Sequence, residues 1–168
     1  TTAGINEFDP EFSFYKKPIK NIIPSKILNL VDAYLLIKGS TYRDVTDKYR
    51  RLFNTIEGKE FKREKFDSCT YSGIFFKRKD DEILRHSGLL TLDFDHVADV
   101  TALKERLIED EYLETELIYV SPSGDGIKCI IKIDSSIGTH EEYFEGVANY
   151  IKATHFIGID ESGKNVSR

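Results

Sequence analysis

Leu89-Leu90-Thr91-Leu92-Asp93-Phe94-Asp95 is the stretch of the chain that decides the fold. Its apolar run is typical of a buried β-strand, and successive side chains of a strand point to opposite faces. Asp93 and Asp95 are therefore expected on one face, and Leu92 and Phe94 on the other. Two carboxylates so close repel each other unless a cation lies between them, and a divalent metal ion is the usual candidate. The stretch predicts a metal-dependent site for phosphoryl transfer.

The elements that follow this strand are the clearest in the chain. A helix is expected from Val100 to Glu109, because Asp99 or Thr101 can cap its first turn. From residue 88 onward the expected order is strand, helix, strand, strand, helix, strand, which predicts a ferredoxin-like (RRM-like) βαββαβ lobe. The other expected elements are strands at Leu117–Ser121 and Ile127–Ile133, a helix containing residues 143–151, and a strand at Phe156–Asp160.

Three acids are candidate metal ligands in this lobe. In the usual strand order of the fold, the first strand lies between the third and the fourth, so the Asp93 strand has the Phe156–Asp160 strand beside it. Asp160 ends that strand much as Asp95 ends the first. Asp93, Asp95 and Asp160 are therefore the predicted catalytic acids, which would hold one or two Mg²⁺ or Mn²⁺ ions. The register of the last strand decides whether Asp160 lies at the same end, and the sequence leaves that register open.

The turn at residues 121–126 and the residues after it are candidates for phosphate binding. Glycines let backbone N–H groups approach phosphate oxygens, and hydroxyls and a lysine add donors. An ordinary glycine-rich hairpin explains the same residues equally well when the turn is taken alone. Its position beside the two-aspartate strand favours phosphate binding, and an arginine at the end of the chain could grip a phosphate. The predicted nucleotide-binding residues are Ser121, Ser123, Gly124, Gly126, Lys128 and Arg168.

The first part of the chain is expected to form a smaller lobe. We predict one α+β domain over residues 1–168, with an N-terminal α/β lobe at 1–79 and a ferredoxin-like catalytic lobe at 80–168. In the N-terminal lobe, Gly39 and Gly58 are expected to end two helices. Its expected elements are a strand at 12–15, helices at 27–37 and 42–56, a basic connector at 59–65 and a strand at 69–76.

The charge is unevenly distributed. The net charge is −5, which argues against a simple basic nucleic-acid binder, yet Lys and Arg predominate in residues 1–79 and Asp and Glu in residues 80–168. A basic surface beside an acidic metal site fits this asymmetry, as do two solvated faces of one domain. No membrane span is expected, and residues 1–10 lack a signal-peptide pattern. We therefore expect a cytoplasmic protein without membrane partners.

Several of these motifs together resemble a known family. The residues are His86-Ser87-Gly88-Leu89-Leu90-Thr91-Leu92-Asp93-Phe94-Asp95, then Ser121-Pro122-Ser123-Gly124-Asp125-Gly126-Ile127-Lys128, then Gly158-Ile159-Asp160 with Ser167-Arg168. They resemble the VirE N-terminal domain family, which is placed with the archaeo-eukaryotic primases, or primase-polymerases. The resemblance implies a bacterial or phage-encoded replication protein of a mobile element, with a fused or associated helicase. The wider superfamily commonly has a histidine where this chain has Lys128, and lysine supplies only a point charge there.

The expected function is that of a DNA primase or polymerase catalytic domain. Such a metal-dependent nucleotidyltransferase would join nucleoside triphosphates on single-stranded or primer-template DNA. Two alternatives use the same residues. The first is a non-catalytic module that binds single-stranded nucleic acid through the sheet and the basic lobe. The second is a metal-dependent nuclease, which would shorten the strand that a polymerase extends.

Overall fold

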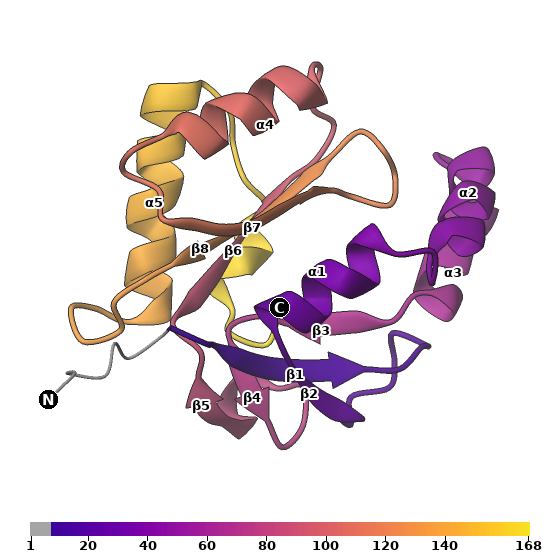
Figure 1. Ribbon diagram of the computed structural model, residues 1–168, viewed down its shortest axis with the longest axis horizontal. Coiled ribbons are helices and arrows are strands. Elements are labelled where there is room, and N and C mark those ends of the chain that lie inside the picture. Colours follow the sequence, from indigo (N-terminus) through magenta and orange to yellow (C-terminus); the bar gives the residue numbers. More distant parts are fainter. Residues whose placement is uncertain (1–7) are drawn as a thin grey trace, which may run out of the picture.

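The computed structural model describes residues 8–168. Residues 1–7, which belong to the predicted N-terminal lobe and to the segment without a signal-peptide pattern, lie outside the described residues. The described chain has mixed α+β structure with five α-helices and three antiparallel sheets, with the strand orders β2-β1-β3, β4-β5 and β6-β8-β7 (Figure 1). This confirms the α+β class. Within residues 8–168, no helix combines the length and the apolar character that crossing a membrane requires.

The sheet that contains the two-aspartate strand carries two helices on one face (Figure 1). Its strands are β6 (Leu89–Phe94), β8 (Ile127–Lys132) and β7 (Thr115–Val120). The helices are α4 (Val100–Glu109), as predicted, and α5 (His140–His155). Alternate side chains of the strands pack against these helices and are removed from water, which stabilises the lobe. The buried side chains of this face include Leu90, Leu92, Phe94, Leu103, Leu107, Cys129, Ile131, Phe144 and Ile151.

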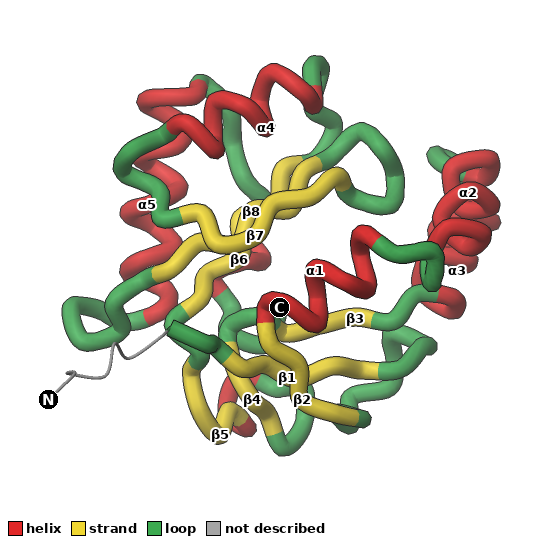
Figure 2. The backbone as a smooth tube through the Cα atoms, in the orientation of Figure 1, coloured by secondary structure: helices red, strands yellow, loops and turns green. Residues whose placement is uncertain are grey.

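The opposite face of the same sheet packs against the N-terminal lobe. There β1 (Glu11–Tyr15) pairs with both β2 (Lys26–Asn29) and β3 (Ser68–Thr70), and α1 (Leu30–Lys38) lies between this sheet and β7 (Figures 1 and 2). Strand β6 is therefore buried from both sides. The second buried cluster contains Phe12, Phe14, Leu28, Ala33 and Tyr71 from the N-terminal lobe, and Leu89, Leu117 and Ile130 from the sheet of β6, β8 and β7.

Two helix predictions in the N-terminal lobe are wrong in their limits. The helix expected at 27–37 begins only at Leu30, because residues 26–29 pair with β1 and the Asn29 side chain caps α1. The helix expected at 42–56 ends at Leu52 as α2 (Arg43–Leu52). The supposed basic connector at 59–65 is helical and belongs to α3 (Ile56–Lys65), whose N-cap Thr55 accepts a hydrogen bond from the backbone N–H of Gly58.

Two strand predictions also differ from the structure. The strand expected at 69–76 is divided into β3 and β4 (Gly73–Phe75), and β4 pairs with the unpredicted β5 (Ile83–His86). The strand expected at Phe156–Asp160 is not formed. Phe156 has a left-handed backbone conformation, with φ 56°, and ends α5, while Asp160 caps the short 3₁₀ helix η2 (Glu161–Lys164). Both ends of the segment are therefore fixed by helix caps and not by a strand ladder.

A chain of hydrogen bonds through two half-buried histidines connects η2 with β5. The backbone N–H of Gly88 donates to Nδ1 of His86 at 3.0 Å, so the proton of that neutral ring is on Nε2. Nε2 of His86 lies 3.0 Å from Nδ1 of His140, and Nε2 of His140 lies 3.0 Å from the carbonyl oxygen of Gly163. Each neutral ring then donates once and accepts once. A side chain at position 163 would meet the Phe144 ring at 2.6 Å, so η2 also packs closely on α5.

This histidine chain predicts that acid destabilises the fold. Burial and the neighbouring His140 lower the pKa of His86 to about 4, from an ordinary 6.5, and burial lowers that of His140. As the pH falls, the unfolded chain binds protons first, so stability present above pH 6.5 is lost toward pH 4. Urea unfolding should show a loss on the order of 1 kcal/mol between about pH 7 and about pH 5, beyond that of a reference variant.

The reference is the double variant His86→Gln/His140→Gln, because glutamine can donate and accept hydrogen bonds but does not titrate. Carboxylates elsewhere titrate equally in both proteins, so the comparison isolates the two rings. An equal loss of stability in both proteins would contradict this account of the histidine chain.

Candidate active site

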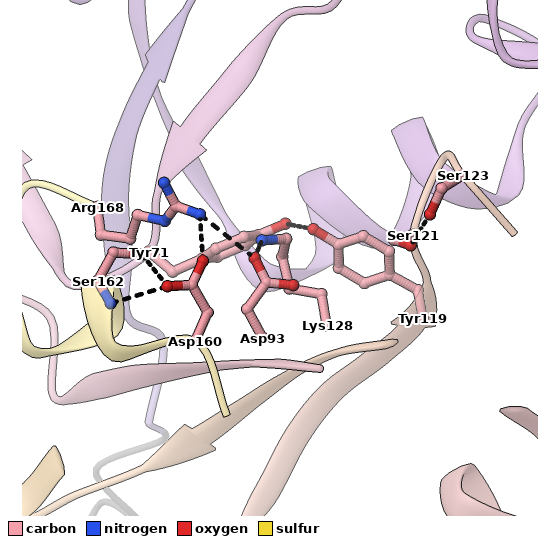
Figure 3. Close-up of polar contacts among 9 residues, drawn as sticks. All are labelled: Tyr71, Asp93, Tyr119, Ser121, Ser123, Lys128, Asp160, Ser162 and Arg168. Atoms are coloured by element: carbon pink, nitrogen blue, oxygen red, sulfur yellow. Dashed lines mark hydrogen bonds and ion pairs between the residues drawn. The ribbon is translucent and has the colours of Figure 1, made fainter. Parts of the chain in front are cut away.

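A polar row crosses the sheet of β6, β8 and β7 on the face that the N-terminal lobe covers. Asp93 of β6 is paired with Lys128 of β8, and Lys128 with Tyr119 of β7. Directly opposed residues of neighbouring strands project from the same face, while Leu92 and Phe94 point into the helix-covered core. Nζ of Lys128 lies 2.6 Å from Oδ2 of Asp93, and the two side chains are 25% and 13% exposed (Figure 3). The predicted acid and the predicted lysine are therefore ion-paired neighbours.

Asp160 lies beside Asp93, which resolves the register that the sequence left open. Although residues 156–160 form no strand, the backbone N–H of Asp160 donates to the carbonyl oxygen of Asp93 at 2.9 Å. The segment thus runs along the edge of β6 that β8 does not occupy. The predicted neighbour is confirmed, and Asp160 is at the same end of β6 as Asp93.

The carboxylate of Asp160 is held ionised by its surroundings. Burial opposes ionisation, but the backbone N–H and the hydroxyl of Ser162 donate to Oδ1 at 2.9 and 2.7 Å. Together with the positive charges of Arg168 and Lys128, these hydrogen bonds outweigh burial and lower the pKa of Asp160. Asp160 is therefore a carboxylate anion with fixed geometry, as a metal ligand should be.

Arg168 connects the two acids. Its Nη2 lies 2.9 Å from Oδ2 of Asp160 and 3.8 Å from Oδ2 of Asp93 (Figure 3). With Lys128 on Asp93, two carboxylates are balanced by two cations in one cluster, which we call the charge cluster: Asp93, Lys128, Asp160 and Arg168. An uncompensated acid in this half-buried position would be costly, and the two basic side chains remove that cost.

The donor set of the charge cluster suits a metal ion that is shared with phosphate. Mg²⁺ is commonly held by one or two carboxylates, with substrate phosphates and waters completing its coordination. Asp93 and Asp160 supply two such carboxylates, and Nη2 of Arg168 lies near both of them. In the described part of the chain, no three His, Cys, Asp or Glu side chains are grouped so as to hold a metal ion by themselves. Waters and substrate oxygens would complete the coordination of a metal ion held by Asp93 and Asp160.

Among the described residues, Asp95 forms no ion pair with Lys128 or Arg168 of the charge cluster. Strand β6 ends at Phe94, Asp95 is exposed, and His96 adopts a left-handed backbone with φ 53°, so the regular alternation of the strand does not continue past Asp95. Burial raises the pKa of Tyr49 in α2, and the charges of Asp125 and Asp95 raise it further. Asp95 thus lies on the side of the site that faces α2. Its role as a metal ligand stays a prediction.

The predicted phosphate-binding turn is a compact loop between β7 and β8. The backbone N–H of Ser121 donates to the carbonyl oxygen of Gly126, and that of Gly124 to the carbonyl oxygen of Ser121, each at 2.9 Å. The hydroxyls of Ser121 and Ser123 are 2.8 Å apart (Figure 3). Gly124 has a φ of 87°, a conformation that glycine adopts without strain. Both serines thus present hydroxyls at the end of the row that begins with Asp93 and Lys128.

Three residues of the site were not among the sequence predictions. The hydroxyls of Tyr71 and Tyr119 lie 3.1 Å apart beside Lys128 (Figure 3), and Ser162 holds Asp160. Tyr119 lies in β7, whereas Tyr71 lies in the turn between β3 and β4, and their contact depends on how the two lobes pack. Ser162 did carry a signal, because a serine two residues after an aspartate is typical of a turn that the aspartate side chain stabilises.

Removal of one hydroxyl tests the electrostatics of Asp160. In Ser162→Ala the carboxylate loses one of its two hydrogen bonds from residue 162, so its pKa should rise toward the ordinary value. Carboxyl-carbon NMR titration measures this shift. Ser167→Ala removes a hydroxyl from the same segment that does not contact Asp160, and it should leave the titration unchanged. If Asp160 titrated identically in Ser162→Ala and in the unchanged protein, the Ser162 hydroxyl would not be a cause of the lowered pKa.

Comparison with known proteins gives one match and one correction. The model of the family described as BT4734-like, N-terminal domain matches residues 61–168, which include every predicted site residue. The resemblance to the VirE N-terminal domain family is therefore wrong as an assignment. Comparisons with curated proteins and with solved structures found no match. Because the family match covers well over half of the sequence, this chain belongs to the BT4734-like, N-terminal domain family.

Proposed function

We propose that this chain is the catalytic domain of a metal-dependent nucleotidyltransferase of the DNA primase or polymerase type, with a primase-polymerase-like fold. One observation carries the proposal: Asp93 and Asp160, from segments 67 residues apart, meet at the end of β6 with Lys128 and Arg168 between and beside them. The element order β6-α4-β7-β8-α5 followed by the Asp160 segment agrees with the βαββαβ order in every element but the last strand.

The charged side chains of the charge cluster could exchange one another for a metal ion and phosphate oxygens when a metal-bound nucleotide binds. Without a ligand, the two acids are neutralised by Lys128 and Arg168. With a nucleoside triphosphate bound, Asp93 and Asp160 would hold Mg²⁺ or Mn²⁺, and the two basic side chains would bind phosphate oxygens. Each charged group then keeps a partner in both states, so no buried charge is left alone.

The reaction needs no nucleophilic side chain. The oxygen of the primer 3′-hydroxyl would bond to the α-phosphorus, the bond from that phosphorus to the bridging oxygen would break, pyrophosphate would leave, and the hydroxyl proton would pass to water. The metal ion supplies charge neutralisation and polarises the hydroxyl. Lys128 and Arg168 would hold the phosphates in line with the attacking oxygen. Such alignment of the reacting groups contributes much of the catalysis in reactions of this kind.

The partners that follow from this reaction are nucleotides and single-stranded or primer-template DNA. A helicase partner and a mobile-element or phage context were implied only by the resemblance to the VirE N-terminal family. Because that assignment is wrong, we do not propose them. Basic side chains of the N-terminal lobe, among them Lys48, Lys59 and Lys62, are exposed and suit contact with a phosphate backbone.

Template-dependent extension of a labelled primer tests the proposal. With Mg²⁺ or Mn²⁺ and nucleoside triphosphates, the unchanged protein should extend the primer, and Asp93→Asn and Asp160→Asn should each lower the rate on the order of 100-fold or more, because each removes a metal ligand. Asp134→Asn serves as the control, because Asp134 is an exposed acid whose carboxylate contacts Ser136 outside the site. It should retain the full rate.

The same assay separates the alternatives. Primer shortening that depends on Asp93 would favour a metal-dependent nuclease. If the unchanged protein binds single strands without extending or shortening them, and Asp93→Asn binds them equally well, the non-catalytic binding module is favoured. Equal extension by the unchanged protein and by both site variants would overturn the catalytic assignment.

A further inference from the structure

Arg50 reaches from the N-terminal lobe to the phosphate-binding turn. Its Nε donates to the carbonyl oxygen of Pro122 at 3.1 Å across 72 residues of sequence. The turn between β7 and β8 extends from the catalytic sheet toward α2, the helix that carries Arg50 (Figure 1). The matched family region begins at residue 61, and Arg50 is not among the residues predicted from the sequence to form the site. The structure gives this residue a partner that neither source indicated.

The helix that carries Arg50 is anchored by its neighbour in the sequence. Tyr49 is 6% exposed, and its ring meets those of Phe53 and Phe66 edge to face, with centroids 6.1 and 5.7 Å away. Such aromatic pairs prefer this geometry and fix the orientation of the helix. Arg50 is the next residue of α2, so the packing of Tyr49 fixes the position of its backbone.

The guanidinium of Arg50 packs against Gly124 of the turn. A Cβ built on Gly124 would lie 3.4 Å from Nε of Arg50 and 3.7 Å from its Cζ. The guanidinium therefore lies against the glycine and above the loop that carries the Ser121 and Ser123 hydroxyls. An arginine and two serine hydroxyls thus belong to the same turn, and donors of these kinds are common in phosphate sites.

Most of the donors of Arg50 are available to a ligand. A guanidinium has five N–H donors in a planar fork, and Nε is used by Pro122. Arg50 is exposed, and within residues 8–168 its guanidinium has no carboxylate in ion-pair contact. The nearest acid of the turn, Asp125, is instead paired with Nδ1 of His96 at 2.9 Å. The outer edge of the fork is thus free for an anion.

We infer that Arg50 binds the outer phosphates of the nucleotide and makes the site selective for triphosphates over monophosphates. The inference rests on the proposed function, because the phosphate that reacts must lie at Asp93 and Asp160. Lys128 is the second residue of β8, directly after the turn, so phosphates beyond the reacting one would extend from Lys128 toward the turn and Arg50. A monophosphate would end at Lys128 and Arg168.

Calorimetric binding of dATP and dAMP, with Mg²⁺ present, tests this inference. Arg50→Ala should weaken the binding of dATP about tenfold and that of dAMP less than about twofold, because one charge-assisted contact is lost from the outer phosphates alone. Arg50→Lys keeps the charge but not the planar fork of donors, so its affinity for dATP should lie between those of the unchanged protein and Arg50→Ala. The control is Arg51→Ala, a loss of equal charge at the next residue of α2 in the hollow beside α3. It should change neither affinity by more than about twofold.

The outcomes separate this inference from the function on which it rests. If the unchanged protein prefers dATP and Arg50→Ala keeps the same preference, Arg50 has no such role, while the proposed function stands. If Arg50→Ala weakens both nucleotides equally, Arg50 only supports the shape of the turn, and the inference is overturned. If the unchanged protein binds neither nucleotide, both proposals fail.

Discussion

The burial of β6 from both sides is the constraint on which the rest of the structure depends. One face of this strand packs against α4 and α5, and the other against the N-terminal lobe. Leu89, Leu90, Leu92 and Phe94 are fully buried, so the strand is the place where the two hydrophobic clusters meet. A charge near the end of such a strand is stable only with partners at hand. Asp93 therefore requires the cations that gather around it.

Those cations also explain why distant segments converge on one site. Lys128 is brought by the neighbouring strand, and Arg168 by the segment after η2. The same segment brings Asp160, which is held by Ser162 and by its backbone hydrogen bond to Asp93. The histidine chain through His86 and His140 also links η2 to β5 by hydrogen bonds. Packing, hydrogen bonds and charge neutralisation thus act on the same few residues, and the chemistry of the site is a consequence of how the fold compensates one buried acid.

The catalytic lobe was more predictable than the N-terminal lobe, for physical reasons. Residues 100–109 combine an N-cap with apolar side chains at helical spacing, so their helix has a local cause that sequence reveals. In contrast, residues 26–29 form a strand because β1 lies beside them, and that tertiary pairing overrides an apolar pattern that also suits a helix. The charged residues 59–65 were interpreted as a connector because their helix is mostly solvated and shows little periodicity.

The site residues also differ in how far they could be predicted. Asp93 and Lys128 were predicted as neighbours because strand pairing follows from the element order, and the position of Asp160 followed from the expected fold although its strand does not exist. Arg50 could not be predicted. Its contact with Pro122 depends on how two lobes pack, and no pattern within either segment encodes that arrangement. Asp95 follows the last residue of β6, and its role as a metal ligand stays a prediction.

The central claim is that Asp93 and Asp160 bind a metal ion together with a nucleotide that occupies Lys128 and Arg168. The most direct measurement is the affinity for a labelled nucleoside triphosphate by equilibrium dialysis, with and without Mn²⁺. The account predicts that Mn²⁺ tightens binding on the order of tenfold in the unchanged protein and has little effect in Asp93→Asn/Asp160→Asn. Equal affinity with and without Mn²⁺, or an undiminished effect of Mn²⁺ in the double variant, would contradict it.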